Sequence, residues 1–174
     1  PDRVRRAHES GALPASTTTP APGVFLRRDV LPRVRIESVG VLEGGEHVPV
    51  ETMALLAAAC EKCLAASSID RGDVNLLLST GVYRTEFLME PASAALLAGA
   101  LRINDAPSGP DAKKSLAFDV VNSGLGLFNA CHLAADLIRG GAVRHALIAA
   151  SEIENNAPIL PDHLRGIRET ASAL

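Results

Sequence analysis

Aromatic side chains are scarce in this sequence: phenylalanine, tyrosine and tryptophan make up 3% of its 174 residues, and tryptophan is absent. Long apolar runs are missing too, since no stretch approaches the roughly 18 residues that a membrane-spanning helix needs. The net charge is a slightly acidic −3, which argues against nucleic-acid binding. Hydrophobic residues nevertheless make up 47% of the chain, enough for a core without disulfide or metal support. We therefore expect a globular protein with no membrane span and no nucleic-acid partner.

Cysteine is also sparse, and its count of three is odd, so the sequence does not predict a disulfide framework. Together with the lack of a secretory leader, this favours a reducing, cytoplasmic location. Cys60 and Cys63 have the spacing of a redox or metal pair, but they lie in an apolar helical pattern with no second ligand pair. We interpret both as core thiols, and Cys131 in the same way. We expect no metal and no cofactor.

Residues 1–33 differ in composition from the rest of the chain. Pro14, Pro20, Pro22 and Pro32 lie among serines, threonines and several arginines. Proline removes an amide donor and fixes φ, so this stretch forms neither a regular helix nor a central strand. Its basic charge would suit a nucleic-acid arm, but no aromatic side chains are interleaved with the arginines. We therefore interpret it as an extended leader.

From residue 34 to residue 174 the apolar pattern alternates between strand and helix. Weak alternation predicts a strand over 34–42, and apolar steps of three and four predict a helix over 52–66. The other predicted elements are strands over 74–78, 116–121 and 145–150, helices over 91–101 and 125–139, and a surface loop over 104–114. This order indicates an α/β fold with right-handed crossovers and a mainly parallel sheet covered by helices.

Two of these helices carry specific expectations. Pro91 is expected in the first turn of the helix over 91–101, where proline is tolerated. In the helix over 125–139, the spacing predicts an inward face, listed as Leu127, Phe128, Cys131, Ala134, Ala135 and Ile138.

The strand-to-helix turn over 119–126 is the first candidate site, because ligands of α/β sheets bind beyond the carboxyl ends of the strands. A dinucleotide fingerprint fails there, since Asn129 stands where its third glycine belongs. A hydrolase elbow around Ser123 fails at both of its glycine positions. A cysteine thiolate activated by the helix terminus for acyl transfer is the third chemistry that such a turn serves.

The run LAFDVVNSGLGLFN from Leu116, followed after the helix by RGGAVRHALIAASE from Arg139, resembles the ketoacyl synthase III branch of the thiolase superfamily. Upstream, STGVYR from Ser79 and EPASA from Glu90 resemble the olefin-pathway thiolases, which condense two acyl chains head to head. The resemblance covers about residues 46–174. It implies that residues 34–174 form the N-terminal βαβαβ half of a thiolase-like fold, with the last strand of that half near Leu174. The C-terminal half is then absent from this chain, which is either a fragment or one chain of a split protein.

The resemblance also implies an activity. Members of this family transfer an acyl group to a cysteine and then carry out a Claisen condensation with a second thioester, for fatty-acid, polyketide or long-chain olefin or ketone synthesis. The expected substrates are thioesters of coenzyme A or of acyl carrier protein. The expected partner is a second copy of the chain or a related condensing subunit, because the family forms dimers through this half.

In the frame of this resemblance, the nucleophilic cysteine position is occupied by Gly124, which cannot form an acyl-enzyme. Ser123, one position earlier, is the alternative nucleophile, or else its hydroxyl only stabilises the turn. The missing cysteine favours a second hypothesis, a catalytically silent homologue that acts as a structural or substrate-binding partner of an active subunit.

Four further residues are candidates. Glu90 lies in the Glu-Pro context in which the olefin-pathway enzymes place a base that reaches the partner's site, although a carboxylate in a first helical turn has a purely structural explanation too. If Glu90 is a base, acyl transfer without an acyl-enzyme is a third hypothesis. Phe87, Asn122 and Gly126 are predicted to contact the substrate.

Overall fold

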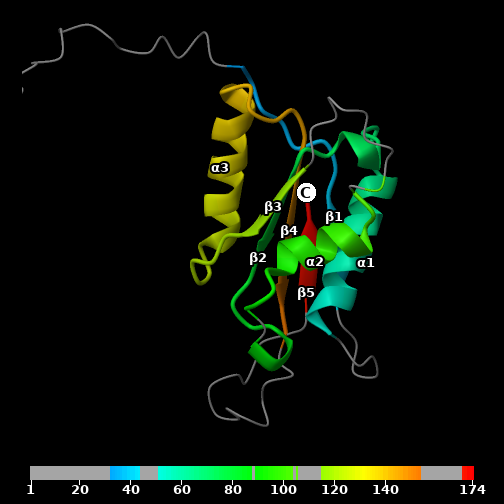
Figure 1. Ribbon diagram of the computed structural model, residues 1–174, viewed down its shortest axis with the longest axis vertical. Coiled ribbons are helices and arrows are strands. Elements are labelled where there is room, and N and C mark those ends of the chain that lie inside the picture. The colour runs from blue at the N-terminus through cyan, green and yellow to red at the C-terminus, as the bar shows by residue number, and fades with distance from the viewer. Residues whose placement is uncertain (1–31, 44–50, 88, 104, 106–114, 154–169) are drawn as a thin grey trace, which may run out of the picture. The chain divides into compact units, whose positions relative to one another are not determined.

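The computed structural model describes residues 32–43, 51–87, 89–103, 105, 115–153 and 170–174. Among them are β1 (Gly40–Glu43), α1 (Thr52–Ala65), η2 (Arg71–Asp73), β2 (Leu76–Thr80), η3 (Thr85–Phe87), α2 (Ser93–Ala100), β3 (Leu116–Asp119), α3 (Gly126–Arg139), β4 (Ala146–Glu152) and β5 (Thr170–Ala173) (Figure 1). The predicted leader lies outside the described residues except for its last two positions. The predicted loop over 104–114 also lies outside them, apart from Asp105.

The described strands form one sheet in the order β1-β5-β4-β2-β3. β2 pairs in parallel with β3 on one side and with β4 on the other. β5 runs antiparallel to both of its neighbours, β4 and β1. The α/β fold class is thus confirmed, and the sheet is mixed: its parallel part is the β3-β2-β4 unit that carries the candidate turn.

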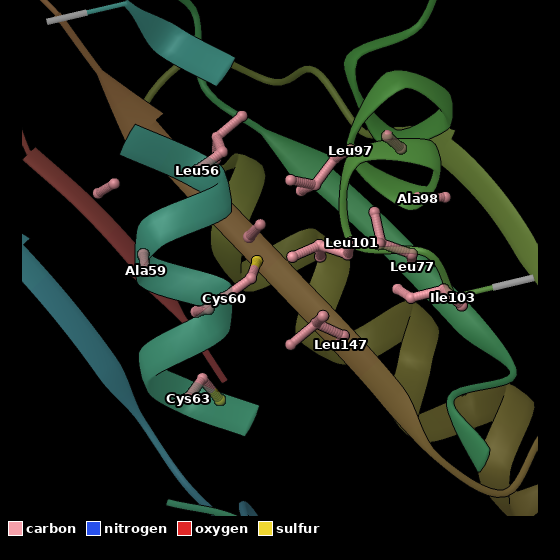
Figure 2. Packing of buried hydrophobic residues seen from close by; sticks show 14 of the residues in the cluster. Leu56, Ala59, Cys60, Cys63, Leu77, Leu97, Ala98, Leu101, Ile103 and Leu147 are labelled. Atoms are coloured by element: carbon pink, nitrogen blue, oxygen red, sulfur yellow. The ribbon is translucent and has the colours of Figure 1, made fainter. Parts of the chain in front are cut away.

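Helices cover both faces of this sheet. α1 and α2 pack on one face, where Leu56, Cys60 and Leu97 meet Leu77 of β2 and Leu147 of β4 (Figure 2). α3 packs on the opposite face. Because β2 is covered on both sides, all five of its residues are buried, as expected for a central strand of a parallel unit.

Three predicted strands have ends that were wrong by two residues: β2 ends at Thr80 rather than at residue 78, β3 at Asp119 rather than at 121, and β4 at Glu152 rather than at 150. Two other boundaries were wrong for a clear physical reason. The first strand spans only Gly40–Glu43, because the preceding residues lie instead against the end of α1, where the Ser38 hydroxyl donates to the Cys63 carbonyl at 3.0 Å. The second helix begins at Ser93 rather than at Pro91. Pro91 precedes it in a cis peptide bond with Glu90. The first two amides of this helix donate to a carboxylate on β3, which fixes where the helix begins.

The predicted inward position of Phe128 was also wrong: its side chain is 64% exposed. α3 instead buries Gly126, Ala130 and Ala134, which follow one another at four-residue steps. Phe128 lies two positions from both Gly126 and Ala130, which is about 200° around the helix, so its side chain faces away from the sheet.

Candidate functional site

The turn between β3 and α3 lies at the carboxyl ends of the parallel strands. The Val120 amide donates to the Ser79 carbonyl at 2.8 Å, which continues the β2–β3 ladder one step beyond β3. The Leu125 amide then bonds the Asn122 carbonyl at 2.9 Å, which closes the turn before α3 begins. The turn is exposed from residue 121 to residue 125. Its position and its exposure are those of a ligand-binding turn in an α/β sheet.

Gly124 is exposed, and a Cβ atom added there would meet no atom within 4 Å. A side chain therefore has room at this position. Ser123 is also exposed, but its φ of +45° puts it in the left-handed region, which non-glycine residues seldom adopt. The role of Ser123 as the alternative nucleophile stays a prediction.

Gly126 is buried where α3 meets the end of β2. An added Cβ would lie 2.0 Å from the Thr80 hydroxyl oxygen and 3.3 Å from the Val120 carbonyl oxygen. Only glycine allows this close approach, so the structure gives Gly126 a packing role. Asn122 is exposed within the turn. Contact of either residue with a substrate stays a prediction.

The segment that carries Phe87 and Glu90 is fixed near both of its ends by carboxylates from neighbouring strands. At its start, Glu152 of β4 accepts the amides of Val82 and Tyr83, at 2.9 and 2.7 Å. At its end, the carboxylate of β3 described next accepts two more amides. Glu90 itself is exposed, and the side chain of Phe87 lies outside the described residues.

Asp119, the last residue of β3, accepts the amides of Ser93 and Ala94 at 3.0 and 2.8 Å. Its carboxylate also pairs with Arg84, with 2.6 Å between Nη1 and Oδ2. The Arg84 Nε atom donates to the Gly81 carbonyl at 3.3 Å. Asp119 therefore joins the segment that carries Glu90 to the strand that leads into the turn.

Sequence analysis did not identify Arg84, Asp119 or Glu152. A signal was present, because Asp119 and Glu152 are acidic residues that end two apolar strands of a parallel unit. Carboxylates at such strand ends meet the free amides of nearby loops and helix starts.

The cysteines lie away from the turn. Cys60 and Cys63 are buried in α1, as interpreted from the sequence, and Cys131 is half-buried in α3. Burial, followed by the nearby Cys63 and Glu61, raises the pKa of the Cys60 thiol to about 12. Burial also raises the pKa of Cys131. Neither Cys60 nor Cys131 is therefore poised as a thiolate. No group of three or more potential metal ligands occurs among the described residues.

A cavity of about 250 Å³ lies at the other end of the sheet, where β4 begins. Its wall includes Ala134 and Ile138 of α3, Ile148 of β4 and Ile36 of the segment before β1. It is therefore distinct from the candidate turn. In the described part of the chain, no helix is long and apolar enough to cross a membrane.

The sequence matches no established family profile. One curated relative, the acyl-CoA:acyl-CoA alkyltransferase of Xanthomonas campestris pv. campestris, is 29% identical over 97 residues, which cover 56% of this chain and 26% of that protein. The present chain thus aligns with about a quarter of the curated relative.

Solved structures that are similar to this chain include three of condensing enzymes and their variants. Xanthomonas campestris OleA, in a cysteine-to-serine variant with bound lauric acid and lauroyl-CoA, matches with a TM-score of 0.59 and 23% identity, over 73% of this chain and 40% of that one. A glutamate-to-glutamine variant of OleA gives a TM-score of 0.66 and 16% identity, over 82% and 54%. The 3-oxoacyl-(acyl carrier protein) synthase III FabH of Xanthomonas oryzae pv. oryzae gives 0.63 and 18%, over 82% and 56%.

These likenesses confirm the thiolase-like fold and the resemblance to the olefin-pathway and ketoacyl synthase III proteins. The chain spans about half the length of those solved chains.

Proposed function

We propose that this chain forms the first half of a ketoacyl-synthase-III-like acyltransferase and handles acyl thioesters of coenzyme A or of acyl carrier protein in a Claisen-type condensation. The observation that carries the proposal is the β3–turn–α3 unit, which presents an open position 124 at the start of a 14-residue helix. The similarity to OleA and FabH supports the same reaction class. The products would enter fatty-acid, polyketide or long-chain olefin or ketone synthesis.

The start of α3 suits a thioester carbonyl for two reasons. The first amides of a helix have no acceptor within the helix, and the helix dipole adds a partial positive charge there. Both stabilise the negative charge that develops on the carbonyl oxygen during acyl transfer. With glycine at 124, the acyl group is bound without a covalent bond at that position, and Ser123 is the nearest alternative nucleophile. Glu90, which is exposed to solvent, is the proposed base.

A second candidate function is favoured by one observation, the glycine at position 124. A silent subunit would bind an acyl thioester, or shape the cleft of an active partner, without forming an acyl-enzyme. Three exposed apolar residues around the turn, Val121, Leu125 and Phe128, offer a surface for such a subunit next to the edge strand β3. The partner would be a second copy or a related condensing subunit.

The test restores the missing thiol. In Gly124→Cys, the new thiolate attacks the thioester carbonyl carbon of acyl-CoA, the carbon–sulfur bond to coenzyme A breaks, and the released coenzyme A thiolate takes up a proton. Intact-mass measurement is then expected to show one added acyl group on residue 124. Gly99→Cys is the matched control, because a Cβ there also meets nothing within 4 Å but the residue lies late in α2.

Equal acylation of the two variants, or acylation of neither, would overturn the acyl-transfer proposal. The unmodified chain distinguishes the two functions. A stable adduct mapped to Ser123 contradicts the silent candidate. If the unmodified chain shows turnover but no adduct, and this turnover is lost in Glu90→Ala, the result supports Glu90 as the base. Binding of acyl-CoA with neither adduct nor turnover supports the silent subunit.

A further inference from the structure

The ion pair between Arg84 and Asp119 is almost completely buried. Their side chains are 1% and 12% exposed. Two neighbouring polar side chains, Ser93 and Ser79, are fully buried as well, and Ser79 lies directly opposite Asp119 across the β2–β3 ladder. A polar cluster thus occupies the carboxyl end of the parallel strands, where the sheet would otherwise continue its apolar core.

Stability alone does not explain such a pair. Removing two charges from water costs about as much as their attraction returns, and well-packed apolar residues of the same size often stabilise a fold equally well or better. The Asp119 carboxylate instead fixes the geometry of the groups around it. Its Oδ2 atom accepts from Arg84 and from the Ser93 amide, and its Oδ1 atom accepts from the Ala94 amide. An apolar replacement would satisfy none of these donors.

The bonded groups belong to the two parts of the candidate site. Glu90 precedes Ser93 by three positions, and Asn122 follows Asp119 by three positions. The Asp119 carboxylate is therefore the connection between the segment that carries the proposed base and the turn that carries residue 124. Arg84 orients this carboxylate and lies in the same segment as Glu90, bonded also to the Gly81 carbonyl.

We infer that Arg84 and Asp119 are positioning residues that hold the Glu90 segment in a fixed relation to the turn at Gly124. The part of this inference that concerns catalysis rests on the proposed function. Its structural part, the local coupling of the two segments, is testable without any substrate.

The experiment measures backbone hydrogen exchange in the complete protein with Asp119→Asn, an isosteric change that removes the charge. Exchange is expected to rise at least about tenfold at residues 89–97 and 120–128, with little change in β1 and β5. Arg84→Lys, which keeps a positive charge beside Asp119, is expected to give a smaller rise in the same two segments.

The matched control is Glu61→Gln, which breaks the Arg71–Glu61 pair. Its nitrogen–oxygen distance is also 2.6 Å, but its side chains are 37% and 50% exposed. No change in exchange is expected near either of the two segments, because an exposed pair fixes little. A uniform rise across all strands in Asp119→Asn would show a merely structural role and overturn the inference, as would unchanged exchange in both segments.

If Asp119→Asn fails to fold, the double variant Arg84→Met with Asp119→Asn removes the unpaired buried charge and keeps the inference testable by the same exchange pattern. A second arm measures acylation of Gly124→Cys at saturating acyl-CoA, where adding Asp119→Asn is expected to slow acylation about tenfold. An unchanged rate would overturn the positioning role. If Gly124→Cys is never acylated while local exchange still rises in Asp119→Asn, the proposed function fails and the coupling of the two segments stands.

Discussion

Gly124 and Gly126 are two positions apart, yet a methyl group would meet opposite surroundings at the two residues. At Gly124 it would touch nothing within 4 Å, whereas at Gly126 it would lie 2.0 Å from the Thr80 hydroxyl oxygen. The first glycine is thus free of any packing requirement, and the second is required by packing.

Gly126→Ala is expected to lower the free energy of unfolding by about 1–3 kcal/mol, because α3 must move away from β2 to admit the methyl group. Gly124→Ala, the matched control, is expected to leave it within about 1 kcal/mol of the unmodified value. Urea unfolding of both variants measures the difference. Equal losses in the two variants would contradict the packing role of Gly126.

Cys60 gives a prediction about alkaline pH. Burial raises the pKa of its thiol from 9.0 to about 12. Between these values the unfolded chain releases the proton while the folded chain retains it, so folding stability is complete below pH 9 and decreases toward pH 12. The expected slope is at most about 1.4 kcal/mol per pH unit. Unfolding of Cys60→Ala, followed from pH 8 to pH 11, should lack this part of the slope, and identical slopes in both proteins would contradict it.

The sequence predicted the positions of single residues where these depend only on neighbouring residues in the chain. The strand–turn–helix pattern predicted that Gly124 and Asn122 lie in the exposed turn, whereas their roles in the site come from the resemblance and stay predictions. Arg84 and Asp119 are 35 positions apart and meet only because β2 and β3 pair in one particular register. Such a pairing leaves no trace in local periodicity, so the ion pair was not predicted.

The start of α1 shows how one element depends on another. Its N-cap residue, Glu51, makes no side-chain capping bond. The hydroxyl oxygen of Thr85, in η3, instead accepts the amide of Thr52 at 2.9 Å, and the Thr85 amide donates to the Thr52 hydroxyl oxygen at 2.7 Å. The helix is thus capped from the segment that also carries Glu90.

Thr85→Val keeps the shape of the side chain and removes its hydroxyl. It is expected to lower the free energy of unfolding by about 1–3 kcal/mol, since the amide of the buried Thr52 loses its acceptor. Thr170→Val, at an exposed position of β5, is the control and should change stability by less than about 0.5 kcal/mol. Thermal and urea unfolding measure both changes. A loss in Thr170→Val as large as that in Thr85→Val would contradict the capping role.

Elements with strong periodicity were predicted well. α1 and α3 occupy nearly the predicted ranges, because steps of three and four define a helical face without help from the rest of the fold. β5 has the sequence TASA and no large apolar residue, so no period marks it. Only the resemblance to thiolases suggested a strand near the last residues.

At the scale of the whole molecule, the edge strand β3 and the turn next to it present exposed apolar side chains. Leu116, Val121, Leu125 and Phe128 are each between 46% and 64% exposed. A cluster of this kind beside a strand at the edge of the described sheet is typical of a surface that another chain covers.

Phe128→Asp is therefore expected to weaken self-association, or association with a related condensing subunit, by at least about tenfold in dissociation constant. Ile36 is equally exposed, at 64%, but precedes β1 at the opposite edge of the sheet, so Ile36→Asp is the control. Sedimentation velocity over a range of concentrations measures the effect. Equal weakening by the two variants would exclude the β3 side as the interface.

The sheet order has a consequence for how the chain acquires its structure. β1 comes first among the described strands and β5 last, yet they are direct partners in the sheet. Closing so long a loop is entropically costly, whereas β2, β3 and β4 follow one another and join through shorter connections. During synthesis, all three strands of the parallel unit, β2, β3 and β4, leave the ribosome before β5 does. β1 must wait unpaired until then, so pulse-labelled amides should become protected in β2 and β4 before they do in β1.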